Sequence, residues 1–187
     1  MNLSAHDVAT VLENRLPGLG EVKLQKLLYY CQGWHLAFTG QRLFTEDVVA
    51  WANGPVVAEV WRARAGRTIT PPARPVPSTA LGTIEYVIAN YGRFSGNELI
   101  QRTHDEAPWK LASEDPFAPE NPPLTDEVLR NFFRSQLTEI DAWYGAARED
   151  SQVLRLLSQA LEERHAGRVG VVDDAAGIVD RIRRQSA

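Results

Sequence analysis

Cys31 and His35 are the first two side chains in this sequence that could do chemistry together. Residues four positions apart lie on the same face of a helix, where an imidazole can stabilise a thiolate and make it a nucleophile. Cys31 also belongs to a series of apolar residues, and a free cysteine in such a series usually packs as a small hydrophobic side chain. We therefore favour core packing over catalysis for this cysteine.

The run His104-Asp105-Glu106 is the second candidate, because histidine and carboxylates serve as metal ligands and as general acids and bases. Three adjacent residues of a helix point in three directions, so they cannot all reach one ion. His104 falls near the end of its predicted helix, which favours a histidine that is buried or paired with the helix dipole. The sequence contains no zinc-protease, serine-hydrolase or phosphate-loop motif. We therefore expect no catalytic residues, no metal and no cofactor.

Two lysines, Lys23 and Lys26, alternate with leucines in the segment that precedes Cys31. They could form a basic edge for a protein partner or a phosphate group. They could also lie on a solvated helix face, with their aliphatic stems covering part of the core. We favour the solvated face.

Four of the five tryptophans fall in the first two thirds of the chain: Trp34, Trp51, Trp61 and Trp109. Tryptophan offers a large apolar area and one N–H donor, which suits both protein cores and binding surfaces. Core packing is the default for each of them singly. As a group they also suit a semi-exposed aromatic groove or a surface for a protein partner.

The whole chain has the composition of a globular protein that folds without crosslinks. It has 187 residues, of which 44% are hydrophobic and 24% charged, and a single cysteine, so no internal disulfide can form. Residues 1–7 show no basic start and no apolar h-region, so we expect no signal peptide, and no apolar run is long enough to span a bilayer. The net charge of −4 does not favour nonspecific binding to nucleic acid. We expect a cytoplasmic protein with no membrane contact.

Apolar periodicity and capping residues predict a series of helices. Ser4 and Ser95 each precede an acidic residue by three positions, as in a capping box, and Thr125 is a third N-cap. The helix after Thr125 is predicted to continue to Trp143. The strongest pattern is an amphipathic helix that ends at Thr39-Gly40 and carries Leu24, Leu27, Leu28, Cys31 and Trp34 on one face.

The stretch WANGPVVAEVW, residues 51–61, predicts a corner between a short strand and a helix. Asn53-Gly54 suits a turn, and Pro55 suits the first turn of a helix, where a missing N–H costs nothing. Trp51 and Trp61 would pack on either side of this corner. A phosphate-binding loop would need more glycines or a Lys-Ser/Thr pair, which are absent.

The composition changes after Arg148, where a helix over 149–166 is followed by a short apolar run and a last helix rich in arginine. The fold class is therefore mainly α: a compact helical domain with a small β element, residues 1–147, and a C-terminal helical extension, residues 148–187. The apolar positions of the end of this extension are Val169, Val172, Ile178, Val179 and Ile182.

Three motifs occur in a familiar order: KLQKLLYYCQGW at 23–34, WANGPVVAEVW at 51–61 and THDEAPWK at 103–110. Over about residues 5–145 the chain resembles the Panacea antitoxin domain, the SocA-like or phage-associated GepA-like family. The resemblance implies a mainly helical fold with a small sheet. It also implies a noncatalytic antitoxin in a toxin–antitoxin system, with phage defence as a setting. Such a protein binds and neutralises a toxin encoded by an adjacent gene.

The resemblance leaves the mechanism open. One alternative is a proteolytic adaptor that delivers the toxin to a AAA+ protease. Another is a DNA-binding autoregulator, although no basic recognition helix is visible, and an enzyme built on Cys31 or His104 is the least favoured. The oligomeric state is not predicted. Candidate toxin-binding residues lie on the domain, which we favour slightly, and on the tail: Lys23, Lys26, Tyr30, Trp34, Trp51, Gly54, Pro55, Trp61, His104, Trp109, Val169, Val172, Ile178, Val179 and Ile182.

Overall fold

A computed structural model describes residues 3–66, 75–115 and 119–137 of the chain. In these residues the fold is mainly α with one small antiparallel sheet, as the sequence predicts. None of the helices in the described part is both long and apolar enough to cross a membrane. The elements, in order, are α1 (Ala5–Arg15), α2 (Glu21–Thr39), β1 (Val48–Trp51), β2 (Gly54–Val57), α3 (Ala58–Ala65), α4 (Ser78–Tyr91), α5 (Gly96–Asp105), α6 (Ala107–Ser113) and α7 (Asp126–Ser135).

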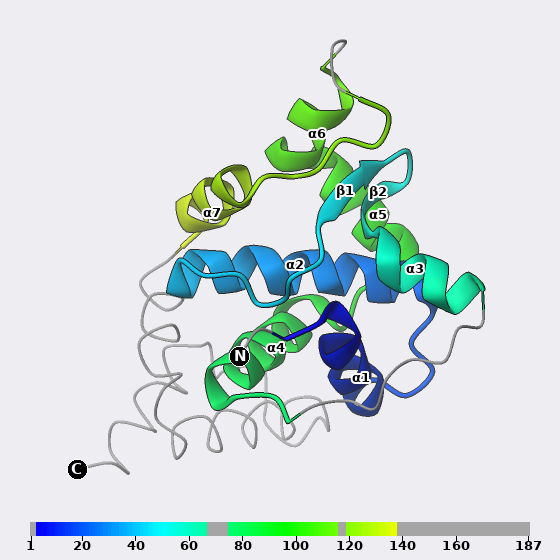
Figure 1. The fold of residues 1–187 in the computed structure, drawn as a ribbon, viewed down its shortest axis with the longest axis vertical. Helices are drawn as coiled ribbons and strands as arrows, with labels where there is room; N and C mark the ends of the chain where they lie inside the picture. The colour runs from blue at the N-terminus through cyan, green and yellow to red at the C-terminus, as the bar shows by residue number, and fades with distance from the viewer. Residues whose placement is uncertain (1–2, 67–74, 116–118, 138–187) are drawn as a thin grey trace, which may run out of the picture. The chain divides into compact units, whose positions relative to one another are not determined.

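Helix α2 is the centre of this arrangement. In Figure 1 it runs across the middle, with α1 and α4 below it and the hairpin, α6 and α7 above it. The expected amphipathic pattern is wrong for most of its length, because residues 24–37 are all buried, polar ones included. A helix that is enclosed on every side forms the core of a domain rather than part of its surface.

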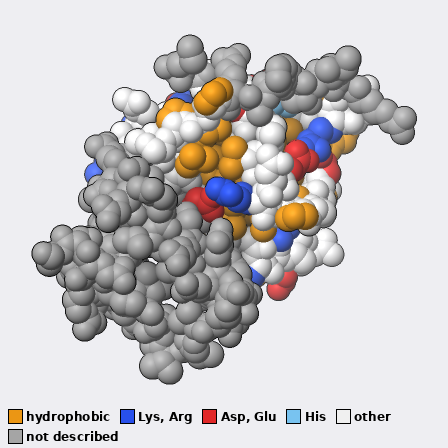
Figure 2. Space-filling model, turned by 90° about the horizontal axis from the view of Figure 1, so that it is seen from below, with side chains coloured by type: hydrophobic (Ala, Val, Ile, Leu, Met, Phe, Trp, Pro, Cys, Tyr) orange, Lys and Arg blue, Asp and Glu red, His pale blue; other side chains and the backbone are white. Residues whose placement is uncertain are grey.

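The lower layer consists of α1 and α4, which pack against α2 and against each other. An ion pair joins these two helices, with Arg15 Nε 2.7 Å from Glu85 Oε1. Viewed from below, the described surface gathers hydrophobic side chains around adjoining basic and acidic ones (Figure 2).

The three helix starts predicted from capping residues are confirmed. Ser4 accepts a hydrogen bond from the Asp7 backbone N–H, and Ser95 accepts one from that of Glu98. In each case the acidic side chain accepts a hydrogen bond from the backbone N–H of the serine. Thr125 accepts from Val128 N at the start of α7. Each cap satisfies backbone donors that a helix start leaves unpaired.

The corner at 51–61 is a β-hairpin, so the prediction that Pro55 starts a helix is wrong. Pro55 lies in β2 opposite Ala50 of β1, and the helix begins three residues later at Ala58. Gly54 has φ +92°, which gives the tight reversal after Ala52-Asn53. The β-branched Val56 and Val57 favour an extended backbone here.

A third segment pairs with the free edge of β1. Ala50 N donates to Pro122 O at 2.8 Å, and Leu124 N donates to Val48 O at 2.8 Å. Residues 122–124 therefore cover an edge that would otherwise expose unpaired backbone groups. This pairing also fixes the chain that leads into α7.

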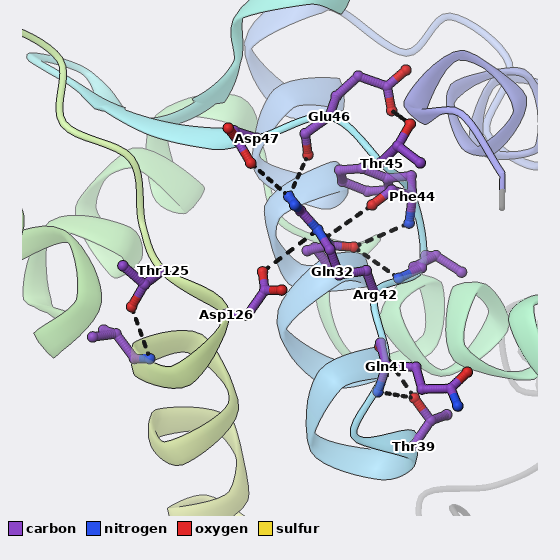
Figure 3. Close-up of polar contacts among 12 residues, drawn as sticks. Gln32, Thr39, Gln41, Arg42, Phe44, Thr45, Glu46, Asp47, Thr125 and Asp126 are labelled. Atoms are coloured by element: carbon purple, nitrogen blue, oxygen red, sulfur yellow. Dashed lines mark hydrogen bonds and ion pairs between the residues drawn. The ribbon is translucent and has the colours of Figure 1, made fainter.

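The loop between α2 and β1 makes polar contacts with side chains of α2 and α7 (Figure 3). Gln32 Oε1 accepts from the backbone N–H groups of Leu43 and Phe44, at 3.0 and 3.2 Å. Arg42 pairs with Asp47 at 2.8 Å and reaches Asp126, the first residue of α7, at 3.5 Å. Through these side-chain contacts the loop links α2 to the start of α7.

Helix α7 packs along α2 through the ring of Phe133, which lies against Gly33 and contacts Tyr29, Tyr30 and Trp34. Within the described residues α7 ends at Ser135, earlier than the predicted end at Trp143. Trp143 itself, like the predicted boundary between 1–147 and 148–187, lies outside the described residues.

Candidate functional site

Three buried polar side chains of α2 hold the hairpin and the loop before it. Gln25 Oε1 accepts from Val57 N at 2.9 Å, Lys26 Nζ donates to Pro55 O at 2.9 Å, and Gln32 bonds to the loop as described above. All three are at most 2% exposed. Buried polar groups remain only where they are hydrogen-bonded, so these contacts specify how the hairpin sits on α2.

The solvated position expected for the two lysines is wrong for Lys26. Its ammonium lies beneath the hairpin, and burial lowers its pKa to about 8. Lys23 is half-buried and donates to Gly92 O at 2.6 Å, which joins α2 to the end of α4. Periodicity alone could not show this, because the hairpin that covers Lys26 comes from residues far along the chain.

Gly54 is a point of close approach between the hairpin and the helices. A Cβ atom placed there would lie 2.8 Å from Thr103 Oγ1 and 2.9 Å from Lys26 Nζ. Thr103 belongs to α5, so Gly54 sits between α2 and α5. Gly54 and Pro55 are both buried, and they support the surface above them rather than form it.

Above the hairpin four side chains form a cluster that we call the aromatic patch: Trp51, Trp61, His104 and Trp109. The rings of Trp51 and Trp61 meet edge to face at 5.1 Å, instead of lying on either side of the corner as expected. Trp109 Nε1 donates to Trp51 O at 2.9 Å, and its ring stacks on His104 at 3.9 Å. Trp61 is 39% exposed, and the other three are partly exposed.

His104 joins the patch to the buried polar groups below it. Burial lowers its pKa, and the nearby charge of Lys26 acts in the same direction. Its Nε2 atom is buried and has no hydrogen-bond partner among the described residues. His104 therefore presents a neutral ring to Trp109, which suits stacking better than charge-based binding.

Two other candidates for toxin contact, Tyr30 and Trp34, lie in the interior. Tyr30 is fully buried and stacks on Tyr91 at 3.8 Å. Trp34 is 4% exposed and donates from Nε1 to the hydroxyl of Tyr91 at 3.0 Å. Among the domain candidates, the structure thus groups Trp51, Trp61, His104 and Trp109 in the aromatic patch and buries Lys26, Tyr30, Trp34, Gly54 and Pro55.

Glu106, the third residue of the candidate run at 104–106, has a role in this region that the sequence did not indicate. It lies between α5 and α6 and accepts hydrogen bonds from Tyr29 and Tyr30, at 2.6 and 2.9 Å. Burial raises the pKa of its carboxyl group to about 7 and keeps the pKa values of both phenols high. The run of His104, Asp105 and Glu106 does diverge as expected, since Asp105 points outward and reaches Lys110 at 3.9 Å.

The raised pKa of Glu106 predicts a dependence of stability on pH. An ordinary pKa of 4.5 applies to the unfolded chain, so between about pH 4.5 and 7 the folded chain binds the additional proton. Stability should therefore fall as the pH rises through this window. Glu106→Gln is expected to remove this part of the fall, which amounts to at most about 3 kcal/mol. Denaturant unfolding at several pH values measures it, with the exposed Glu120→Gln as the matched control; identical slopes in wild type and Glu106→Gln would contradict it.

The pairing of Cys31 with His35 does not form a nucleophile in this structure. Cys31 is fully buried, and burial raises the pKa of its thiol. His35 is also buried, and its Nδ1 atom lies 2.8 Å from Thr83 Oγ1 of α4. Core packing is therefore confirmed for Cys31. Within the described residues, no three histidine, cysteine or acidic side chains are grouped as metal ligands.

The five tail candidates, Val169, Val172, Ile178, Val179 and Ile182, lie outside the described residues. Their part in binding stays a prediction from the sequence.

The central part of the chain matches a model of a known protein family. Residues 24–110 match the family model described as "Antitoxin SocA-like, Panacea domain". This range begins in α2 and ends in α6, so it contains the buried polar side chains, the hairpin and the aromatic patch. Neither the curated proteins nor the solved structures include a match.

Proposed function

Because residues 24–110 match the SocA-like Panacea antitoxin domain, we propose that this chain is an antitoxin that neutralises a toxin by direct protein–protein binding. The family match is the observation that carries the proposal. The toxin would be the product of an adjacent gene, and the pair would act in the cytoplasm. A chain that works by binding needs an exposed set of apolar anchors rather than a convergent catalytic site.

The aromatic patch supplies such anchors. Tryptophan residues dominate the binding energy of many interfaces, and the patch presents three of them beside one neutral histidine. Its side chains are held before any partner arrives, because Trp109 is hydrogen-bonded to Trp51 and stacked on His104. Groups that are already ordered lose less conformational entropy on binding. We therefore assign the main toxin contact to the patch, and to Trp61 as its most exposed member.

The decisive experiment is co-expression of the chain with its neighbouring gene product. We expect the neighbour to inhibit growth alone and the chain to restore growth. A neighbour that is harmless, or that the chain does not counteract, would remove the antitoxin proposal. The AAA+ adaptor mechanism is separated from direct neutralisation by the toxin level, which falls during rescue only if a protease removes the toxin.

Trp61→Ala tests the place of contact. Loss of a central tryptophan anchor should weaken toxin binding at least about 10-fold, while unfolding stays close to wild type because the side chain is partly exposed. Binding is measured by titration calorimetry and unfolding by denaturant. Val22→Ala is the control, since Val22 is also an exposed apolar residue, at 48%. If Trp61→Ala binds normally and Val179→Asp with Ile182→Asp does not, the contact belongs to the tail.

A further inference from the structure

A second surface lies beside the aromatic patch, on the other side of α6. It is an open groove of about 340 Å³ between α6 and the segment that leads into α7. Its apolar lining comes from Leu111 and Pro108 of α6, Pro122 and Pro123 of the segment, and Val128 of α7. Leu111 is 66% exposed, the largest exposure among the large hydrophobic side chains that the structure describes. Such an apolar surface is a common mark of a protein-binding site.

Both walls of the groove are fixed. The segment wall pairs with β1 through Ala50 and Pro122, and its prolines restrict the backbone further. Asn121 in this wall has φ +57°, a conformation that asparagine tolerates better than most residues. The α6 wall is joined to β1 through Trp109 and Trp51. The groove is therefore formed before a partner binds.

Acidic residues adjoin the groove. Asp115 lines it, and Glu114, Glu120 and Glu127 are exposed and adjacent in the sequence to lining residues. The basic side chain of α6, Lys110, is directed to Asp105 at 3.9 Å. An apolar floor with a negative rim complements a segment that presents an apolar side chain among lysines or arginines.

We propose that this groove binds an apolar side chain from a basic segment of the toxin, next to the contact made by the aromatic patch. The proposal rests on the antitoxin function given above. Helix α6 carries both surfaces, with Trp109 in the patch and Leu111 in the groove, so one partner surface can cover them together. The apolar side chain slows dissociation, and the acidic rim attracts the basic segment and so speeds association.

The test separates these two contributions. Leu111→Ser should weaken binding of the purified toxin about 5- to 10-fold, mainly through faster dissociation. The combined variant Glu114→Gln, Glu120→Gln and Glu127→Gln should slow association and reduce its dependence on salt concentration. Both are measured by surface plasmon resonance at several salt concentrations. Val22→Ser is the matched control on another element, and it should bind as wild type.

The outcomes distinguish failure of the groove proposal from failure of the antitoxin proposal. If wild type restores growth but Leu111→Ser and the charge variant both bind with wild-type rates and salt dependence, the groove proposal is overturned and the antitoxin function stands. If wild type itself neither binds nor neutralises the toxin, both proposals fail together. A control that weakens binding as much as Leu111→Ser would also overturn the assignment to the groove.

Discussion

Replacing Gly33 by alanine is expected to lower the free energy of unfolding by about 1–3 kcal/mol, as overpacking of a well-filled core does. A Cβ atom at this position would lie 2.0 Å from the nearest ring atom of Phe133, so α7 would have to move away from α2. In an exposed helix the same change would stabilise by about 1 kcal/mol, since glycine is a poor helix former. Denaturant unfolding measures the difference.

Whether Gly33→Ala destabilises or stabilises the fold depends on the Phe133 ring, so removing that ring provides the control. In a Phe133→Ala background the ring is absent, and Gly33→Ala should become neutral or stabilising. A loss of stability that is equally large with and without the Phe133 ring would show that contact with α7 is not the cause.

Gly54→Val is expected to lower the free energy of unfolding by about 3 kcal/mol. One part is backbone strain, because φ +92° is unfavourable for a residue with a Cβ and most of all for a β-branched one. The other part is the close approach to Thr103 and to the Lys26 ammonium. The hairpin would have to lift from α2, and the bond from Lys26 to Pro55 O would be lost. Neutralisation of the toxin should fall only as a consequence.

Gly18→Val separates the two parts. Gly18 has φ +80°, but a Cβ there meets no atom within 4 Å, so only the strain of about 1–2 kcal/mol should remain. The comparison uses thermal and denaturant unfolding of both variants. A Gly54→Val protein that folds as stably as wild type but no longer binds the toxin would instead make the hairpin a direct contact.

The local features of this fold could be predicted from the sequence, and those that depend on tertiary contacts could not. Ser4, Ser95 and Thr125 cap their helices because a cap needs only a side chain and the backbone three residues on. The expectation that Pro55 starts a helix rests on an equally local rule, the preference of proline for the first turn of a helix. Its carbonyl and the N–H of Val57 instead bond to side chains of α2, and the chain stays extended there.

The candidate site divides in the same way. The tryptophans were recognisable by their residue type alone, and three of them do lie together with His104. Glu106 was recognisable as part of the run at 104–106, but its role was not, because that role depends on two tyrosines more than 70 positions away. A carboxylate two residues before Pro108 at a helix start is a local signal, but it indicates a cap rather than a buried acceptor.

The burial of α2 has a consequence for identifying the partner. The stretch KLQKLLYYCQGW lies mostly in the interior, out of reach of any other molecule as long as the domain is folded. This stretch, one of the three motifs that carry the resemblance, therefore holds information about how the chain folds and almost none about what it binds. If the chain is the antitoxin proposed above, substitutions on α3 and α6 would redirect it to another toxin and leave that stretch unaltered. A search for the proposed toxin should start from Trp61 and Leu111 rather than from KLQKLLYYCQGW.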